Sequence, residues 1–198
     1  SDLLSPQFHK GRREALRSLL TENSVAIFFA NSIKNRSNDV DFEFHQDPNF
    51  YYLTGYTEPH GILFIFKNDQ YTGNDHYNEL VFVQPRDSST ELWAGKRLGV
   101  DGVKTRLGFE NAYTNNQFAD FKLNLAGLDQ VFIIPDDQEM EDNSRDRGDR
   151  YSLKKHLKAK MDTTGLNINT ILLKEMMSSL REVKEEEEIV LLRKAIDI

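Results

Sequence analysis

The fold is decided by residues 42–66, which read FEFHQDPNFYYLTGYTEPHGILFIF. Apolar and polar residues alternate over residues 40–45, which predicts a half-buried strand. Asp47-Pro48 predicts the start of a helix over Asn49–Thr54, which the following glycine ends. The continuously apolar segment Ile62–Phe66 predicts a buried strand. A strand, a helix and a strand in succession are typical of an α/β fold.

The rest of the chain continues this alternation of helices and strands. Strands are expected at residues 25–30, 79–84 and 131–134. Helices are expected after Ser5-Pro6 and near residues 99–108, 116–125 and 152–160. The polar residues 70–78 are expected to form a loop. The pattern as a whole therefore predicts the α/β class.

The composition excludes several classes of protein. The chain has 198 residues, enough for one domain or a crowded two. Its 25 basic and 32 acidic residues give a net charge of −7, so we expect no nucleic-acid partner. Its longest apolar run, Val25–Ala30, is far too short for a membrane-spanning helix, so we expect no membrane partner. The chain has no cysteine, which excludes disulfides and thiol chemistry and fits a cytoplasmic protein.

The sequence offers no catalytic signature and no compact metal site. None of its histidines has HExxH spacing; they are His9, His45, His60, His76 and His156. His45 and Asp47 come nearest to a metal pair, but a polar strand end explains them better. The acidic residues between 136 and 142 lack the pattern of a calcium loop. We therefore expect no catalytic residue and no metal ligand within this chain.

Four basic residues are close in sequence and interleaved with leucine and glycine, namely Lys96, Arg97, Lys104 and Arg106, and we call them the basic group. We expect them to lie on a solvated face of the protein.

Two stretches are too unusual for ordinary packing. Residues 36–59 are dense in aromatic side chains, and residues 91–99, ELWAGKRLG, contain the only tryptophan, Trp93. The first stretch resembles the R-x-x-D … F-x-x-Q-x-x-x-F-x-Y-L-T-G-x-x-E-P signature in the N-terminal, non-catalytic domain of the Xaa-Pro aminopeptidases (aminopeptidase P). The second resembles the E-x-W-x-G-x-R-L-G segment of the bacterial members. Residues 180–195 resemble the junction to the family's catalytic domain, with Glu185-Glu186 where Ser-Pro is usual.

This resemblance covers nearly the whole chain and implies both a fold and a domain organisation. The implied fold is a mixed, roughly six-stranded sheet flanked by helices. Residues 1–180 are expected to form the N-terminal domain, and residues 181–198 the junction and the first helix leading to a C-terminal "pita-bread" catalytic domain. Because the chain halts within an amphipathic helix, we expect it to be a piece of a longer protein.

The resemblance also implies an activity for the longer protein. In the family, the catalytic domain binds two divalent metal ions, commonly manganese, and removes the N-terminal residue from peptides whose second residue is proline. None of those metal ligands can be placed on this chain, so the fragment alone is expected to be inactive. Its implied partners are its own catalytic domain, further copies of itself in a dimer or tetramer, and the proline-containing peptide.

Trp93 is the substrate-gating candidate. It matches a family tryptophan that helps to narrow the entrance to the active site of a neighbouring subunit, and the alternative is that its indole packs against its own domain. Phe50-Tyr51-Tyr52 are expected in the core, and Gly55, Glu58 and Pro59 in the turn.

Two other functions stay open. The same domain occurs in prolidases, which cleave Xaa-Pro dipeptides only. Related pita-bread proteins that have lost their metal ligands bind proteins or peptides without catalysis.

Overall fold

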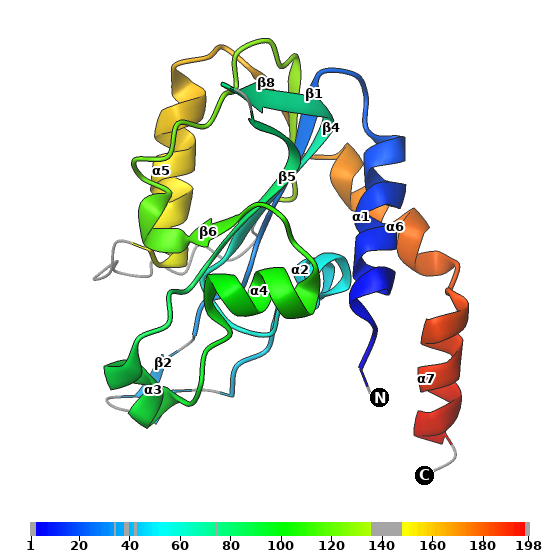
Figure 1. The fold of residues 1–198 in the computed structure, drawn as a ribbon. Coiled ribbons are helices and arrows are strands. Elements are labelled where there is room, and N and C mark those ends of the chain that lie inside the picture. Colours follow the sequence, from blue (N-terminus) through cyan, green and yellow to red (C-terminus); the bar gives the residue numbers. More distant parts are fainter. Residues whose placement is uncertain are drawn as a thin grey trace.

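The computed structural model describes residues 3–33, 35–37, 40–41, 43–73, 75–135 and 148–196; within these ranges it does not describe the side chains of residues 35–37, 40–41, 90, 93 and 94. The fold is a mixed six-stranded sheet in the order β6-β5-β4-β1-β7-β8, with helices packed on both faces (Figure 1). This confirms the sheet and the α/β class predicted from the sequence.

The central strands are β1 (Ser24–Phe29), β4 (Ile62–Thr72) and β5 (Asp75–Val83), and each pairs antiparallel with the next. The outer strands add parallel pairs: β7 (Gln130–Ile133) on β1, β8 (Asn167–Asn169) on β7, and β6 (Ala112–Thr114) on β5. A separate two-stranded ribbon joins β2 (Asn35–Ser37) and β3 (Val40–Asp41).

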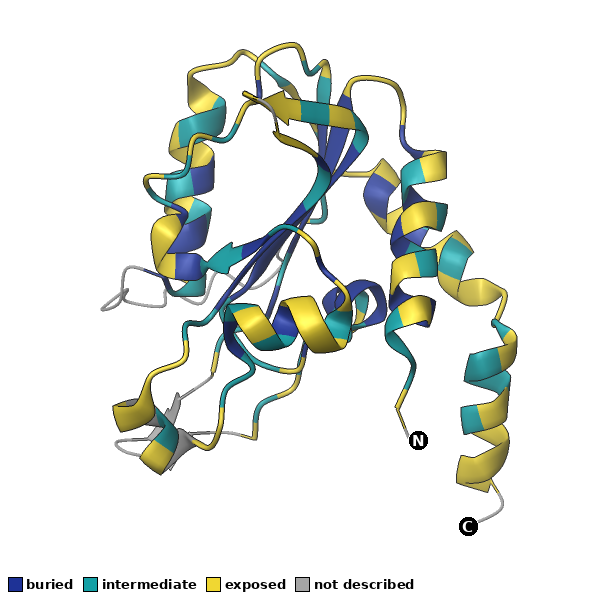
Figure 2. Cartoon of the chain, in the orientation of Figure 1, coloured by how far each residue is buried: buried dark blue, intermediate teal, exposed yellow. Residues whose placement is uncertain are grey.

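Alternation along the strands builds two hydrophobic cores. Because successive side chains of a strand point to opposite faces, Ala26 and Phe28 enter one core, and Val25 and Ile27 enter the other. Both faces of β1 are therefore covered, which explains why the strand is continuously apolar. Figure 2 shows this buried centre between two layers of helices.

The first core is covered by α1 (Pro6–Leu19), α2 (Pro48–Thr54), α4 (Gly99–Leu107) and α6 (Leu172–Glu182). The second is covered by α5 (Arg150–Asp162) and by the segment after the short 3₁₀ turn η1 (Asn115–Gln117). Two further helices are α3 (Ser88–Ala94) and α7 (Glu186–Ile196), and α7 has no buried residue. No helix in the described part of the chain is both long and apolar enough to cross a membrane.

Three local predictions were wrong. Residues 70–78 form most of a hairpin and not a loop: β4 and β5 continue pairing through Tyr71 and His76, with Gly73 at positive φ in the turn. The strand expected over residues 40–45 is reduced to β3. The helix expected near residues 116–125 is only the turn η1. In the hairpin, both sheet faces are solvated at its tip, so no apolar alternation marks it.

Candidate functional site

Glu58 joins the two unusual stretches of the sequence. Its Oε1 accepts a hydrogen bond of 2.6 Å from the backbone N–H of Leu98, and its Oε2 accepts one of 2.9 Å from the hydroxyl of Tyr56. Burial raises the pKa of Tyr56 well above its ordinary value, so this phenol stays protonated and can donate. Glu58, the expected turn residue, therefore also links the 36–59 stretch to the 91–99 stretch, and we call this pair of hydrogen bonds the Glu58 tie.

Gln46 and Asp47 hold the backbone of the first stretch. The Gln46 side chain accepts from the N–H groups of Asn31 and Asp47 and donates to the carbonyls of Tyr56 and Glu58, at distances of 2.8–3.2 Å. Asp47 caps α2 by accepting from the N–H of Phe50 at 2.8 Å. Asp47 is thus a helix cap, and burial raises the pKa of its carboxyl despite these hydrogen bonds.

Gly55 ends α2 in the left-handed conformation, with φ of +70°. A Cβ at this position would lie 2.8 Å from the imidazole ring of His9. The ring is held in place because its Nδ1 donates to the carbonyl of Tyr52 at 2.9 Å. Glycine is therefore required here by conformation and by space, as expected of a turn residue.

The helix α3 carries Trp93. Although Trp93 stands in a charged segment of the sequence that contains glycines, the structure places it in a short helix with Asp87 as its N-cap. The side chain of Glu91 in this helix binds the guanidinium of Arg86 at 2.9 and 3.0 Å, and it accepts a hydrogen bond from the N–H of Arg97 at 3.4 Å. These contacts fasten α3 to the segments before and after it. The side chain of Trp93 lies outside the described residues, and its neighbour Leu92 is 84% exposed.

A cavity of about 360 Å³ lies between the loop after α3 and the helix α4. It is lined by Glu58, Arg86, Lys96, Arg97, Leu98, Asp101, Gly102, Thr105 and Arg106. The side chain of Arg86 crosses Gly99, where a Cβ would overlap its Cγ, and Gly99 has φ of +64°. Three members of the basic group thus line one cavity, and Lys104 is outside it. No pattern in the sequence predicts this cavity, because its walls come from segments that the fold brings together.

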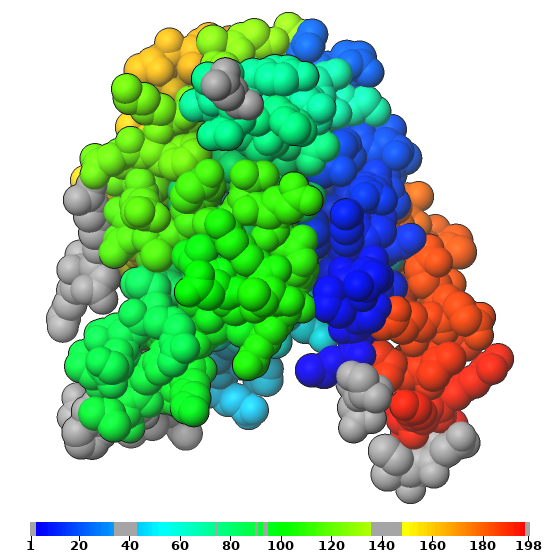
Figure 3. Space-filling view, in the orientation of Figure 1, coloured from blue at the N-terminus to red at the C-terminus, as the bar shows by residue number. Residues whose placement is uncertain are grey.

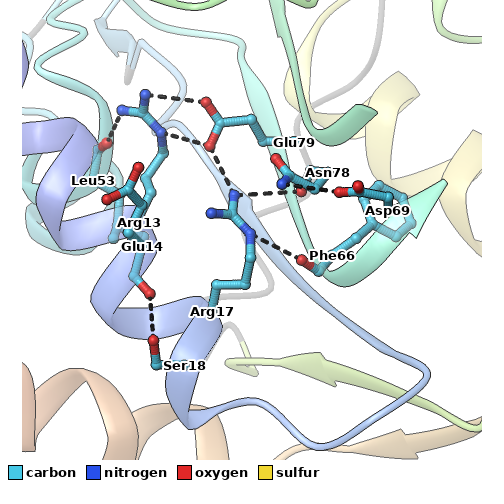
Figure 4. A network of polar contacts seen from close by, with 9 residues as sticks. All are labelled: Arg13, Glu14, Arg17, Ser18, Leu53, Phe66, Asp69, Asn78 and Glu79. Carbon is cyan, nitrogen blue, oxygen red and sulfur yellow. Dashed lines mark hydrogen bonds and ion pairs between the residues drawn. The ribbon is translucent and has the colours of Figure 1, made fainter. Parts of the chain in front are cut away.

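A buried network fastens α1 to the sheet (Figure 4). Arg13 is completely buried and donates to both carboxylate oxygens of Glu79, at 3.0 and 3.1 Å, and to the carbonyl of Leu53 at 2.8 Å. Arg17 donates to the same carboxylate at 3.0 Å and to the carbonyl of Phe66 at 3.1 Å. This network was not predicted from the sequence, although Arg13 and Arg17 are four residues apart and therefore share one face of α1.

The residues expected at the domain junction contact the start of α1. Ser5 caps α1, and both its N–H and its hydroxyl donate to the carboxylate of Glu187, the hydroxyl at 2.8 Å. Arg12 forms an ion pair of 2.6 Å with Glu185. The hydroxyl of Tyr52 donates to the carbonyl of Leu180 at 3.0 Å. The beginning of α7 is therefore anchored, while its apolar side chains Val190, Leu192 and Ile196 are exposed.

The described residues contain no group of three or more histidine, aspartate or glutamate side chains arranged to hold a metal ion. The acidic residues between 136 and 142 lie outside the described part of the chain.

Comparison with known proteins identifies the family. The family model described as "Aminopeptidase P, N-terminal domain" matches residues 9–132. The chain belongs to this family. Its match begins in α1 and ends in β7, so it contains the Glu58 tie, α3 and the α3–α4 cavity.

Similar proteins agree with this assignment. The Xaa-Pro aminopeptidase of Escherichia coli is 30% identical and aligns with 98% of this chain and 43% of its own length. That of Haemophilus influenzae is 29% identical, over 93% of this chain and 38% of its own length. A solved structure of E. coli aminopeptidase P with the inhibitor Pro-Leu superposes with a TM-score of 0.75 at 27% identity, over 98% of this chain and 42% of that one. The resemblance in the sequence is confirmed, and the chain spans about two fifths of these relatives.

Proposed function

We propose that this chain is the non-catalytic N-terminal domain of a metal-dependent Xaa-Pro aminopeptidase, whose full-length form releases the N-terminal residue from peptides with proline in second place. One observation carries the proposal. The chain matches the N-terminal domain family and aligns almost end to end with enzymes of that name, while covering less than half of their length.

The proposed partner within the same polypeptide is a C-terminal catalytic domain. In this proposal residues 1–180 are the N-terminal domain and residues 181–198 begin the connection. The anchored start of α7 and its exposed apolar side chains support this, because such a helix needs a further surface to cover it. Figure 3 shows α3 and α7 projecting from the same end of the molecule with a hollow between them.

The two divalent metal ions of the proposed enzyme, manganese being the expected metal, do not fit the described residues, which offer no suitable ligand group. We therefore assign the ions to the catalytic domain and derive no step through them here. A cytoplasmic location is part of the same proposal, and the cysteine-free sequence is compatible with it.

The proposed role of the N-terminal domain is to restrict access to the active site in a homo-oligomer, a dimer or a tetramer. Trp93 is the proposed gating residue. Its helix α3 projects from the body and exposes Leu92, as an element that contacts a neighbouring subunit would (Figure 1).

The activity is tested on the full-length protein with divalent metal. We expect it to cleave peptides of three or more residues that begin Xaa-Pro, and we expect the 198-residue chain alone to cleave none. Cleavage restricted to Xaa-Pro dipeptides would instead identify a prolidase. Absence of cleavage and of bound metal in the full-length protein would favour a peptide-binding protein.

The gating role is tested by Trp93→Ala in the same full-length protein. We expect kcat/KM for longer peptides to fall, while the melting temperature changes little. Tyr71→Ala is the control, because this side chain is also aromatic and 67% exposed but lies on the β4–β5 hairpin. Unchanged kinetics with a strongly lowered melting temperature would show that the indole packs in its own domain.

A further inference from the structure

We propose that the α3–α4 cavity binds a carboxylate group carried by the peptide substrate beyond its proline. This inference rests on the proposed function, since it takes the peptide to pass beside α3. It adds a binding site made by Lys96, Arg97 and Arg106 in the N-terminal domain.

The charge of the cavity is opposite to that of the protein. Its lining has four basic residues and two acidic ones, whereas the whole chain has a net charge of −7. A concave surface with a local positive excess concentrates anions against the field of the rest of the molecule.

The acidic groups near the cavity are mostly engaged already. Both carboxylate oxygens of Glu58 accept hydrogen bonds from protein groups, and Glu91 neutralises Arg86 in a two-point ion pair. Hydrogen bonding to Arg86 also lowers the pKa of Glu91, which keeps that carboxylate charged. Asp101 is the other acid in the lining; its backbone carbonyl accepts from the hydroxyl of Thr105 at 2.8 Å, whereas no described side chain donates to its carboxylate.

The cations, by contrast, are available. Among the residues that the structure describes, Lys96, Arg97 and Arg106 form no ion pair and no side-chain hydrogen bond, and they come from two different segments. Like charges that surround a shared cavity repel one another, and an anion among them removes this repulsion. An arginine guanidinium is also matched in shape to a carboxylate, which it can bind through two parallel hydrogen bonds.

The floor of the cavity favours an organic ligand. Leu98 and Gly102 line it together with the cations, and the Leu98 side chain packs directly on Gly102, where a Cβ would lie 2.7 Å from it, so this part of the wall is apolar and closely packed. The volume of about 360 Å³ lies in the range of small-molecule pockets. A cavity of this size and lining fits an amino-acid residue with its carboxylate better than a bare inorganic anion.

The binding test uses the 198-residue chain with N-acetyl-Gly-Pro-Leu and its C-terminal amide as probes, followed by amide chemical shifts. We expect the acid to shift resonances of residues 96–106 and to bind about 3- to 10-fold more tightly than the amide. Arg97→Gln and Arg106→Gln should each weaken binding of the acid by a similar factor. Lys104→Gln is the matched control, since Lys104 lies on the same helix as Arg106 but outside the cavity.

Equal affinity for the acid and the amide, or equal losses in Lys104→Gln and Arg106→Gln, would overturn the proposal. Inorganic phosphate that displaces the peptide at equal concentration would also overturn it, because the site would then be a general oxyanion site. These outcomes are independent of catalysis. A full-length protein without peptidase activity would refute the proposed function and leave the binding result standing.

Discussion

Glu79→Gln should destabilise the protein strongly, although Glu79 does not line the α3–α4 cavity. The glutamine loses the negative charge that faces Arg13, whose side chain is 0% exposed, and Arg17, whose side chain is 16% exposed. Removing one partner of a buried ion pair typically costs about 3–5 kcal/mol, because the remaining charge stays buried without compensation. The glutamine keeps one acceptor oxygen, and Arg13 keeps its hydrogen bond to the carbonyl of Leu53. We therefore expect a loss of stability at the lower end of this range, about 3 kcal/mol.

Urea denaturation and thermal melting measure this loss. For a chain of this length, about 3 kcal/mol corresponds to a melting temperature lowered by roughly 6–12 °C. Glu14→Gln is the control, because Glu14 is an exposed acid on α1, the helix that carries Arg13 and Arg17, and its loss should stay within about 0.5 kcal/mol. Replacing both partners, in Arg13→Met with Glu79→Met, should cost less than Glu79→Gln alone. A Glu79→Gln variant as stable as Glu14→Gln would refute the reasoning.

Three further changes test other parts of the structure. Gly55→Ala should cost about 2–4 kcal/mol from its positive φ and its overlap with His9, whereas Gly11→Ala, in open space on α1, should be neutral or slightly stabilising in the same melts. Burial lowers the pKa of His9 below its ordinary 6.5, so below this pH the unfolded chain binds a proton that the native chain does not bind. The free energy of unfolding should therefore fall as the pH drops below 6.5, and His9→Gln should make this pH dependence weaker. Glu58→Gln should cost about 1–2 kcal/mol and accelerate hydrogen exchange at the Leu98 amide; exchange as slow as in the parent would show that the carboxylate does not hold this loop.

Local signals predicted the elements whose formation is decided by their own residues. The helix α2 follows from the Asp47 cap, the Pro48 start and the Gly55 stop, all of which lie within one short stretch of the chain. The strand β1 follows from an apolar run long enough to be buried on both faces. The end of the β4–β5 hairpin could not be predicted in this way, because cross-strand backbone pairing stabilises it and leaves its polar side chains in solvent.

The cavity was beyond prediction for a related reason. The basic residues around it are ordinary surface residues when considered along the sequence, and contacts such as the Glu58–Leu98 hydrogen bond and the packing of Arg86 on Gly99 bring their segments together. Sequence spacing reports contacts along one element, whereas this site depends on contacts between elements.

Single carboxylates connect the parts of the molecule that the proposals concern. Glu58 reaches a residue 40 positions away, Glu79 one 66 positions away, and Glu187 one 182 positions away. Glu58 holds the α3–α4 loop and Glu187 holds the start of α7, and both contacts are only partly buried, whereas the two cores that cover the sheet are apolar and buried. The projecting end of the molecule should therefore open locally before the sheet unfolds. Hydrogen exchange would show this as early loss of protection at Leu98 and at the start of α7, with β1 and β4 still protected, and simultaneous loss at all four would contradict it.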